Sequence, residues 1–160
     1  MKKIILFISA IFFTISLPGQ TKTFRGAWFD IKYPYAFKVK PSLKSATNTN
    51  GYESAFFESP DRLVEFYVFS PQWRGEATDI ELKPSEKITG DKTETEGNTS
   101  IRWWTIAAKN GSYTRSYQEK TYNISNTNWI IGIKYKNQAA FNKYKKQYLA
   151  FKSSLVQYAD

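Results

Sequence analysis

Apolar and polar residues alternate along most of the chain from residue 25 to residue 136. This period of two indicates β-strands, and clusters of turn-forming residues separate the runs. Asn110-Gly111, between two such runs, is a strong hairpin signal. Because neighbouring runs are joined by tight turns, we expect an antiparallel meander. The expected strands are Arg25–Ile31, Phe37–Lys40, Tyr52–Glu58, Leu63–Ser70, Lys87–Glu94, Ser100–Ala108, Ser112–Asn123 and Asn128–Lys136.

The pattern changes after Tyr135, where apolar residues begin to recur every three or four positions. Asn137 is a good helix N-cap, and Gln138 would be the first helical residue. The recurring apolar positions form one stripe of a helix. They are Phe141, Tyr144, Tyr148, Phe151 and Leu155. We expect this C-terminal helix to fold back across the sheet and bury the stripe. Recognition of a partner helix is the alternative.

Two of the expected strands carry large apolar side chains on both faces, Leu63–Ser70 and Ser100–Ala108. Side chains alternate along a strand, so Trp103 and Trp104 must project to opposite faces. A sheet with such strands needs cover on both sides. The helix covers one face. The other face is left to the irregular segments 41–51 and 70–90, the second of which can hold a short helical turn near residues 77–82. We expect one tryptophan of the pair to be deeply buried and the other to lie under a loop or at the floor of a shallow groove.

Three stretches resemble the PsbP-like family: FDIKYPYAFKV at 29–39, FFESPDRLVEFYVFSP at 56–71, and the strand and helix that begin at NWIIGIKYKNQAAF. The resemblance implies an α+β domain in which an antiparallel sheet is packed by a C-terminal helix in an α/β/α sandwich. It also suggests similarity to exported bacterial members of unknown function. The photosystem-binding role of the photosynthetic members has no counterpart in these residues.

The N-terminus has the pattern of an export signal. Lys2 and Lys3 precede an apolar run from Ile4 to Leu17, and Pro18-Gly19 follows. The run is shorter than the roughly 20 apolar residues of a membrane span. We therefore expect a signal peptide at 1–20, a single domain at 21–160, and a periplasmic or secreted protein without a transmembrane segment after cleavage. An uncleaved anchor is the alternative.

Composition excludes several kinds of chemistry. The chain contains no cysteine and no histidine, so disulfides, Cys- or His-ligated zinc, and histidine-based catalytic triads are ruled out. The acidic residues Asp91, Glu94 and Glu96 do not fit a calcium loop. No phosphate-binding loop or dinucleotide fingerprint is present. We expect no metal and no cofactor.

The formal net charge is +9, or +7 without Lys2 and Lys3. An exported basic protein could bind an envelope protein, a lipid or an acidic glycan as its partner. The simpler interpretation of the charge is a solvated lysine-rich surface. Aromatic and basic side chains are interleaved, as in sites that stack on sugar rings or bases, and export disfavours nucleic acid. The candidate ligand-binding residues are Trp73, Trp103, Trp104, Tyr113 and Arg115. The competing interpretation is that most of these rings belong to the core.

We expect a monomeric, non-enzymatic binding or interaction module of the envelope. The alternative is a small hydrolase or lyase that acts on envelope glycans with two carboxylates. Glu53, Glu58, Glu65 and Glu119 are the candidates on predicted strands. No catalytic residue is assigned.

Overall fold

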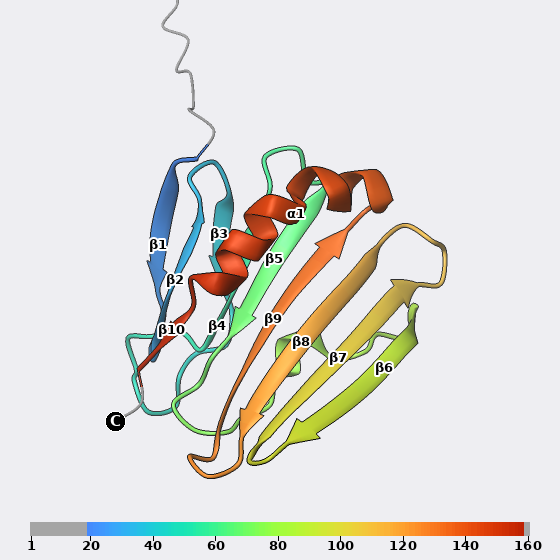
Figure 1. The fold of residues 1–160 in the computed structure, drawn as a ribbon. Helices are drawn as coiled ribbons and strands as arrows, with labels where there is room; N and C mark the ends of the chain where they lie inside the picture. Colours follow the sequence, from blue (N-terminus) through green and yellow to red (C-terminus); the bar gives the residue numbers. More distant parts are fainter. Residues whose placement is uncertain (1–18, 159–160) are drawn as a thin grey trace, which may run out of the picture.

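The computed structural model describes residues 19–158 as two antiparallel sheets and one α-helix (Figure 1). The expected signal peptide and its apolar run lie outside the described residues, apart from Gly19 and Gln20. The strands are β1 (Thr21–Arg25), β2 (Phe29–Pro34), β3 (Lys38–Pro41), β4 (Ser54–Glu58), β5 (Val64–Phe69), β6 (Glu86–Glu96), β7 (Thr99–Ala108), β8 (Thr114–Tyr122), β9 (Thr127–Tyr135) and β10 (Val156–Gln157). The helix α1 spans Gln138–Ser153, and a 3-10 turn, η1, spans Thr78–Ile80.

The larger sheet has seven strands in the order β3-β4-β5-β9-β8-β7-β6. All of its neighbouring pairs are antiparallel, which confirms the expected α+β class. The sheet consists of two meanders, β3-β4-β5 and β6-β7-β8-β9, joined where β5 pairs with β9. Because β5 is central and β6 is at the edge, the connection 70–85 must cross one face of the sheet. We call this the loop face, and the opposite side the helix face.

The helix face carries the larger core. Asn137 caps α1 through a hydrogen bond that its side chain accepts from the Ala140 backbone N–H, as the sequence predicts. The stripe is confirmed as core, since Tyr144 and Phe151 are buried and the other members pack against the same cluster. The second sheet, ordered β1-β2-β10, lies beside α1 and adds Phe29 and Ile31 to this core. The helix and the small sheet together cover β4, β5 and β9 (Figure 1).

The loop face carries a smaller core under the connection 70–85. Tyr67, Phe69, Ile106, Tyr117 and Ile130 of the sheet pack there with Ile80 of η1. The expected helical turn near residues 77–82 is thus present, but it is a single 3-10 turn. Among residues 19–158, α1 is the one α-helix, so irregular chain supplies the second outer layer. Pro71, Gly75 and Pro84 in this connection prevent a longer helix.

The first expected strand, Arg25–Ile31, was wrong, because the chain turns at residues 26–28 between β1 and β2. The Gly26 N–H donates to the Phe29 carbonyl at 2.8 Å, which closes the turn. Only glycine fits here, since a Cβ at this position would lie 2.2 Å from the Phe29 ring. Strands β1 and β10 of the small sheet show little apolar alternation in the sequence, because β1 is exposed and polar and β10 has only two residues.

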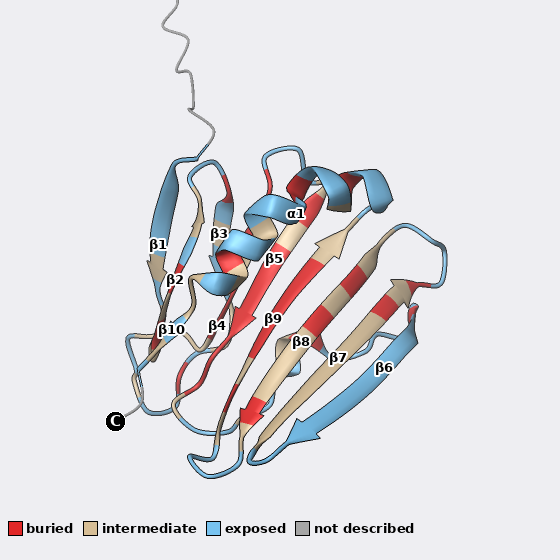
Figure 2. Cartoon of the chain, in the orientation of Figure 1, coloured by how far each residue is buried: buried red, intermediate tan, exposed pale blue. Residues whose placement is uncertain are grey.

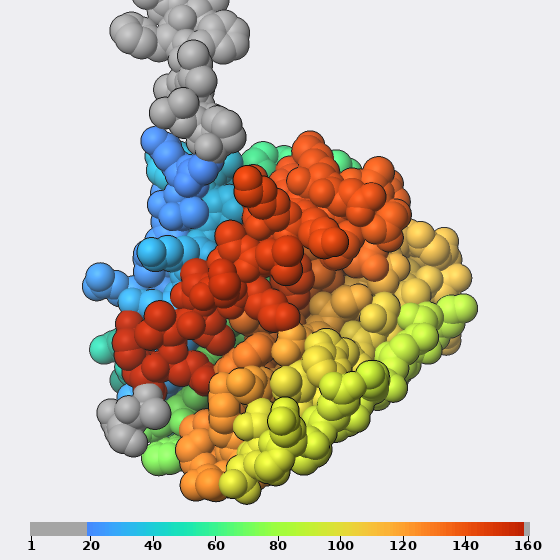
Figure 3. All heavy atoms as spheres, viewed as in Figure 1, coloured from blue at the N-terminus to red at the C-terminus, as the bar shows by residue number. Residues whose placement is uncertain are grey.

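Strand β7 is less buried than its apolar sequence predicts. Trp103 and Trp104 do project to opposite faces, but both are only partly buried. The expectation of one deeply buried tryptophan was therefore wrong. The reason is the position of β7, which is next to the edge strand and beyond the reach of α1 (Figure 3).

Strand β6 forms one edge of the large sheet, and every residue of it except Glu86 is exposed (Figure 2). Its pairing with β7 shifts register between Ile88 and Gly90, which marks a bulge. Within the described residues, no helix is long and apolar enough to cross a membrane.

Candidate functional site

A buried arginine fastens the connection 70–85 to the loop face. Arg115 projects from β8 and is 5% exposed. Its Nε and Nη2 donate to the two carboxylate oxygens of Glu86, at 2.9 and 2.6 Å. Its remaining bonds go to the backbone carbonyls of Ile80 at 2.7 Å and Glu81 at 2.9 Å, and to the Tyr117 hydroxyl at 3.0 Å. All three guanidinium nitrogens of Arg115 therefore have hydrogen-bond partners inside the protein.

Glu86 is held from several directions in this network. The Tyr113 hydroxyl donates to its Oε1 at 2.7 Å, and the Lys83 backbone N–H donates to its Oε2 at 2.8 Å. Burial by itself would raise the pKa of the Glu86 carboxyl, but the hydrogen bonds from Arg115 and Tyr113 outweigh it and lower this pKa to about 2. Burial also raises the pKa of Tyr117 to about 12, although Arg115 opposes that rise. Glu86 is therefore ionised at neutral pH, and its hydrogen bonds hold it in one position.

Asp79 of η1 makes a second link between the connection and the sheet. Its carboxylate accepts hydrogen bonds of 2.6 Å from the Ser54 hydroxyl on β4 and the Tyr67 hydroxyl on β5. Burial, followed by the charge of Asp79, raises the pKa of Tyr67 far above its ordinary value. Asp79 thus ties the connection to β4 and β5.

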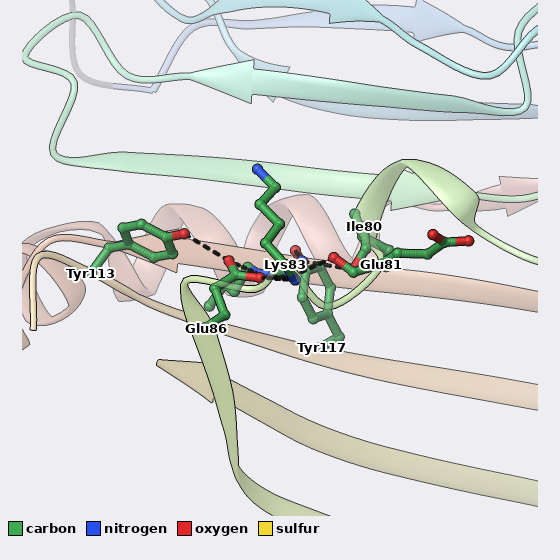
Figure 4. A network of polar contacts seen from close by, with 7 residues as sticks. Ile80, Glu81, Lys83, Glu86, Tyr113 and Tyr117 are labelled. Atoms are coloured by element: carbon green, nitrogen blue, oxygen red, sulfur yellow. Dashed lines mark hydrogen bonds and ion pairs between the residues drawn. The ribbon is translucent and has the colours of Figure 1, made fainter. Parts of the chain in front are cut away.

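A hollow of about 350 Å³ opens between these two links, and we call it the lysine hollow. Its size is within the roughly 300–1,000 Å³ of small-molecule sites. Lys40 of β3, Lys83 of the connection and Lys134 of β9 line it, together with the aromatic rings of Phe56, Tyr113 and Tyr117. Figure 4 shows the Lys83 side chain extending away from the Glu86 network.

The ammonium groups of Lys40 and Lys83 make no hydrogen bond or ion pair with any residue between 19 and 158. The ammonium of Lys134 lies 4.0 Å from the Glu65 carboxylate and 4.7 Å from the centre of the Tyr113 ring. Glu65 is the one carboxylate in the lining that no short hydrogen bond holds among the described residues. Burial raises its pKa more than the charge of Lys134 lowers it.

A second hollow of about 390 Å³ adjoins the first and shares Glu65, Tyr113 and Lys134 with it. Glu58 also lines this second hollow, and it is the direct cross-strand partner of Glu65. Direct partners have Cβ atoms about 4.5–5.5 Å apart, so two carboxylates face the same space. The Glu58 side chain is more exposed, and it lies 4.0 Å from Arg62.

The five residues expected to bind a ligand do not form one groove. Tyr113 and Arg115 border the lysine hollow. Trp104 lies in a separate hollow of about 370 Å³ next to the connection, where its ring stacks on Tyr117 at 5.2 Å and the Arg102 guanidinium lies 4.9 Å from its centre. Its indole therefore already has partners inside the protein.

The other two tryptophans lie apart from the lysine hollow. Trp103 faces the helix side of the sheet, opposite Gln118 on β8. Trp73 is 51% exposed in the connection. The predicted set thus contributes only Tyr113 as a ring facing the lysine hollow.

Sequence reasoning missed the three lysines because they come from segments far apart in the chain. Lys40, Lys83 and Lys134 meet only through the pairing of β5 with β9 and the path of the connection. The one local signal was Lys134 itself, a charged residue near the end of a largely apolar strand.

The described residues contain no group of three or more acidic side chains placed to hold a metal ion. The acids near the β6–β7 turn separate onto different faces, because Asp91 pairs in register with Trp104 and Glu94 with Ile101. Asp91 instead accepts two hydrogen bonds from Arg102, at 2.9 and 2.6 Å.

No family model matches the chain, and no curated protein matches it. Among solved structures, the chain is similar to the solution structure of cyanobacterial PsbP (CyanoP) from Synechocystis sp. PCC 6803. The two share 9% sequence identity, and the match covers 87% of this chain and 92% of that chain with a TM-score of 0.48. At this identity and TM-score the match extends no function to the chain, and the fold class rests on the sheets and the helix described above.

Proposed function

We propose that the protein is an exported, monomeric and non-enzymatic module of the periplasm or the medium that binds an acidic glycan in the lysine hollow. The observation that supports this most directly is that the ammonium groups of Lys40 and Lys83 face one cavity and make no hydrogen bond or close ion pair within residues 19–158. The lining carries four cationic side chains against the carboxylates of Glu65, Asp79 and Glu86, and hydrogen bonds already hold Asp79 and Glu86, so the lysines can attract an anion.

The other groups in the lining suit a sugar. The rings of Phe56 and Tyr113 offer apolar faces against which a pyranose can pack, and the Glu65 carboxyl can accept hydrogen bonds from sugar hydroxyls. A carboxylated sugar would place its charge near the lysines. An unmodified phosphate would use the lysines alone and leave the rings without a role.

The test is a titration of the purified protein with uronic-acid oligosaccharides at low and moderate salt. Lys40→Gln/Lys83→Gln should weaken binding at least tenfold. The control is Lys87→Gln/Lys145→Gln, which removes the same charge from exposed positions outside the lysine hollow. Equal losses of affinity in the two double variants would show that the binding is nonspecific charge attraction. A neutral oligosaccharide of the same length should bind much more weakly.

One observation favours a second candidate, a carboxylate-based glycan hydrolase or lyase. Glu58 and Glu65 face the adjoining hollow from neighbouring strands in different environments, and burial raises the pKa of Glu65. In such a pair Glu65 would be the general acid and Glu58 the base or nucleophile. An assay for new reducing ends should then show loss of cleavage in both Glu58→Gln and Glu65→Gln, with Glu96→Gln as the control. Binding without cleavage would leave the first proposal standing.

A further inference from the structure

A different groove lies on the opposite side of the molecule, where α1 meets the β1–β2 hairpin. It has a volume of about 360 Å³ in the chain that retains Gly19 and Gln20, which line one end of it. Figure 3 shows the helix and the hairpin side by side along this edge. The groove shares no residue with the lysine hollow or with the adjoining hollow. It is therefore a separate candidate site.

The floor of this groove is apolar. Tyr33 and Pro34 of β2 form one side, and Ala150 and Phe151 of α1 form the other. Burial raises the pKa of the Tyr33 hydroxyl, in keeping with an apolar setting. The adjacent Ser154 hydroxyl is already used, because it donates to the helix carbonyl of Phe151 at 2.7 Å and accepts from the Lys32 backbone N–H at 2.9 Å. The floor thus offers mainly carbon surface.

The walls of the groove carry one lysine on each side, Lys32 from β2 and Lys146 from α1. Neither ammonium group makes a hydrogen bond or ion pair within residues 19–158. No acidic residue lines the groove, in contrast to the lysine hollow. Helix α1 itself contains no aspartate or glutamate. Two free cations therefore flank an apolar floor without an internal counter-charge.

We propose that this groove binds the carboxylate end of a single-chain amphiphile, a long-chain fatty acid. The apolar floor would take the first part of the alkyl chain, and Lys32 and Lys146 would pair with the carboxylate. Charge complementarity selects an anionic head group over a cationic or neutral one. A flat anionic membrane would meet the exposed lysines of α1 without needing a groove, so it is the other outcome that the test must separate.

The experiment titrates the purified protein with decanoate below its micelle concentration and follows binding by calorimetry and by NMR shifts. We expect saturable binding of one decanoate. Decanol and decyltrimethylammonium should bind at least tenfold more weakly, and acetate should not bind. Saturable binding of all three ten-carbon ligands with equal affinity would overturn the role of the lysines.

Variants then locate the site. Lys32→Gln/Lys146→Gln should weaken decanoate binding at least tenfold, whereas Lys38→Gln/Lys145→Gln, which removes two exposed lysines outside the groove, should change it little. Ala150→Trp should block the groove without removing charge, because Ala150 is exposed on α1. Binding that survives Ala150→Trp would overturn the proposal. So would binding only to anionic vesicles, with no response to monomeric decanoate.

Discussion

Arg115 and Glu86 form a bidentate ion pair across 29 positions of sequence, and their side chains are 6% and 1% exposed. Removing one partner leaves the other charge buried and unpaired, which is among the costly changes in a protein. We expect Arg115→Met to lower the free energy of unfolding by about 3–5 kcal/mol, measured by urea denaturation. Arg115→Met/Glu86→Leu should recover a substantial part of that loss.

The matched control for this pair is Arg102→Met, which breaks the exposed ion pair with Asp91. Exposed pairs contribute about 0–1 kcal/mol, so its effect should be small. Equal effects of Arg115→Met and Arg102→Met would mean that the connection 70–85 is not fastened by Arg115.

Stability should fall in acid. In the folded chain the pKa of Glu86 is about 2, below the ordinary value of 4.5. The folded state therefore binds fewer protons than the unfolded state between these values. The stabilisation from Glu86 is complete above about pH 4.5 and is lost as the pH falls through 2.

Asp61 adds to this acid sensitivity. Its burial would raise its pKa, but hydrogen bonds from Lys143, Ser59 and Tyr144 lower it well below the ordinary 3.8. Urea denaturation at pH 7, 4 and 2.5 should show a falling free energy of unfolding, with a smaller fall in Asp61→Asn. A free energy that stays constant over this range would contradict both assignments.

Gly132 of β9 lies directly under the ring of Tyr117 on β8. A Cβ at this position would lie 2.1 Å from the Tyr117 Cδ1, so the ring would have to move and disturb its contacts with Arg115 and Trp104. We expect Gly132→Ala to lower the melting temperature, with a cost of about 1–3 kcal/mol. Gly90→Ala is the control, because the nearest atom to its Cβ would be 4.0 Å away. Similar melting temperatures for both variants would mean that the Tyr117 ring does not lie against Gly132.

Export should be accompanied by cleavage. The intact mass of the exported product should correspond to a chain that begins near Gln20 or Thr21, close to the first residue of β1. The cell-bound precursor serves as the control for this measurement. Retention of residues 1–17 in the exported product would contradict the signal peptide and favour an uncleaved anchor.

The sequence predicted the elements that local pattern controls. Alternation located most strands of the large sheet, and the Asn110-Gly111 hairpin is present, with Gly111 at a φ of 74° that glycine readily adopts. The cap at Asn137 and the apolar stripe identified α1. These features depend on residues close together in the chain, so a single sequence contains enough information to find them.

The sequence predicted that segment 70–90 helps to cover the second face of the sheet, but it did not reveal which residues meet there, because that depends on the order of the strands. The pairing of β5 with β9 is what sends the connection across the loop face and brings Glu86 to Arg115. The same path unites the lysines of the lysine hollow. The strand order also places β7 next to the edge strand β6. Trp103 and Trp104 therefore remain partly exposed, although their sequence is typical of core residues.

Strand β6 ends the large sheet with a long, exposed edge. A free edge of this kind can pair with another chain and start fibre growth. Here Lys87, Asp91, Lys92 and Glu94 place charges along the strand, and the bulge at Gly90 interrupts its regular pairing. A second copy would have to bring these charges together and match the bulge. We therefore expect concentrated solutions of the protein to stay clear and free of fibrils.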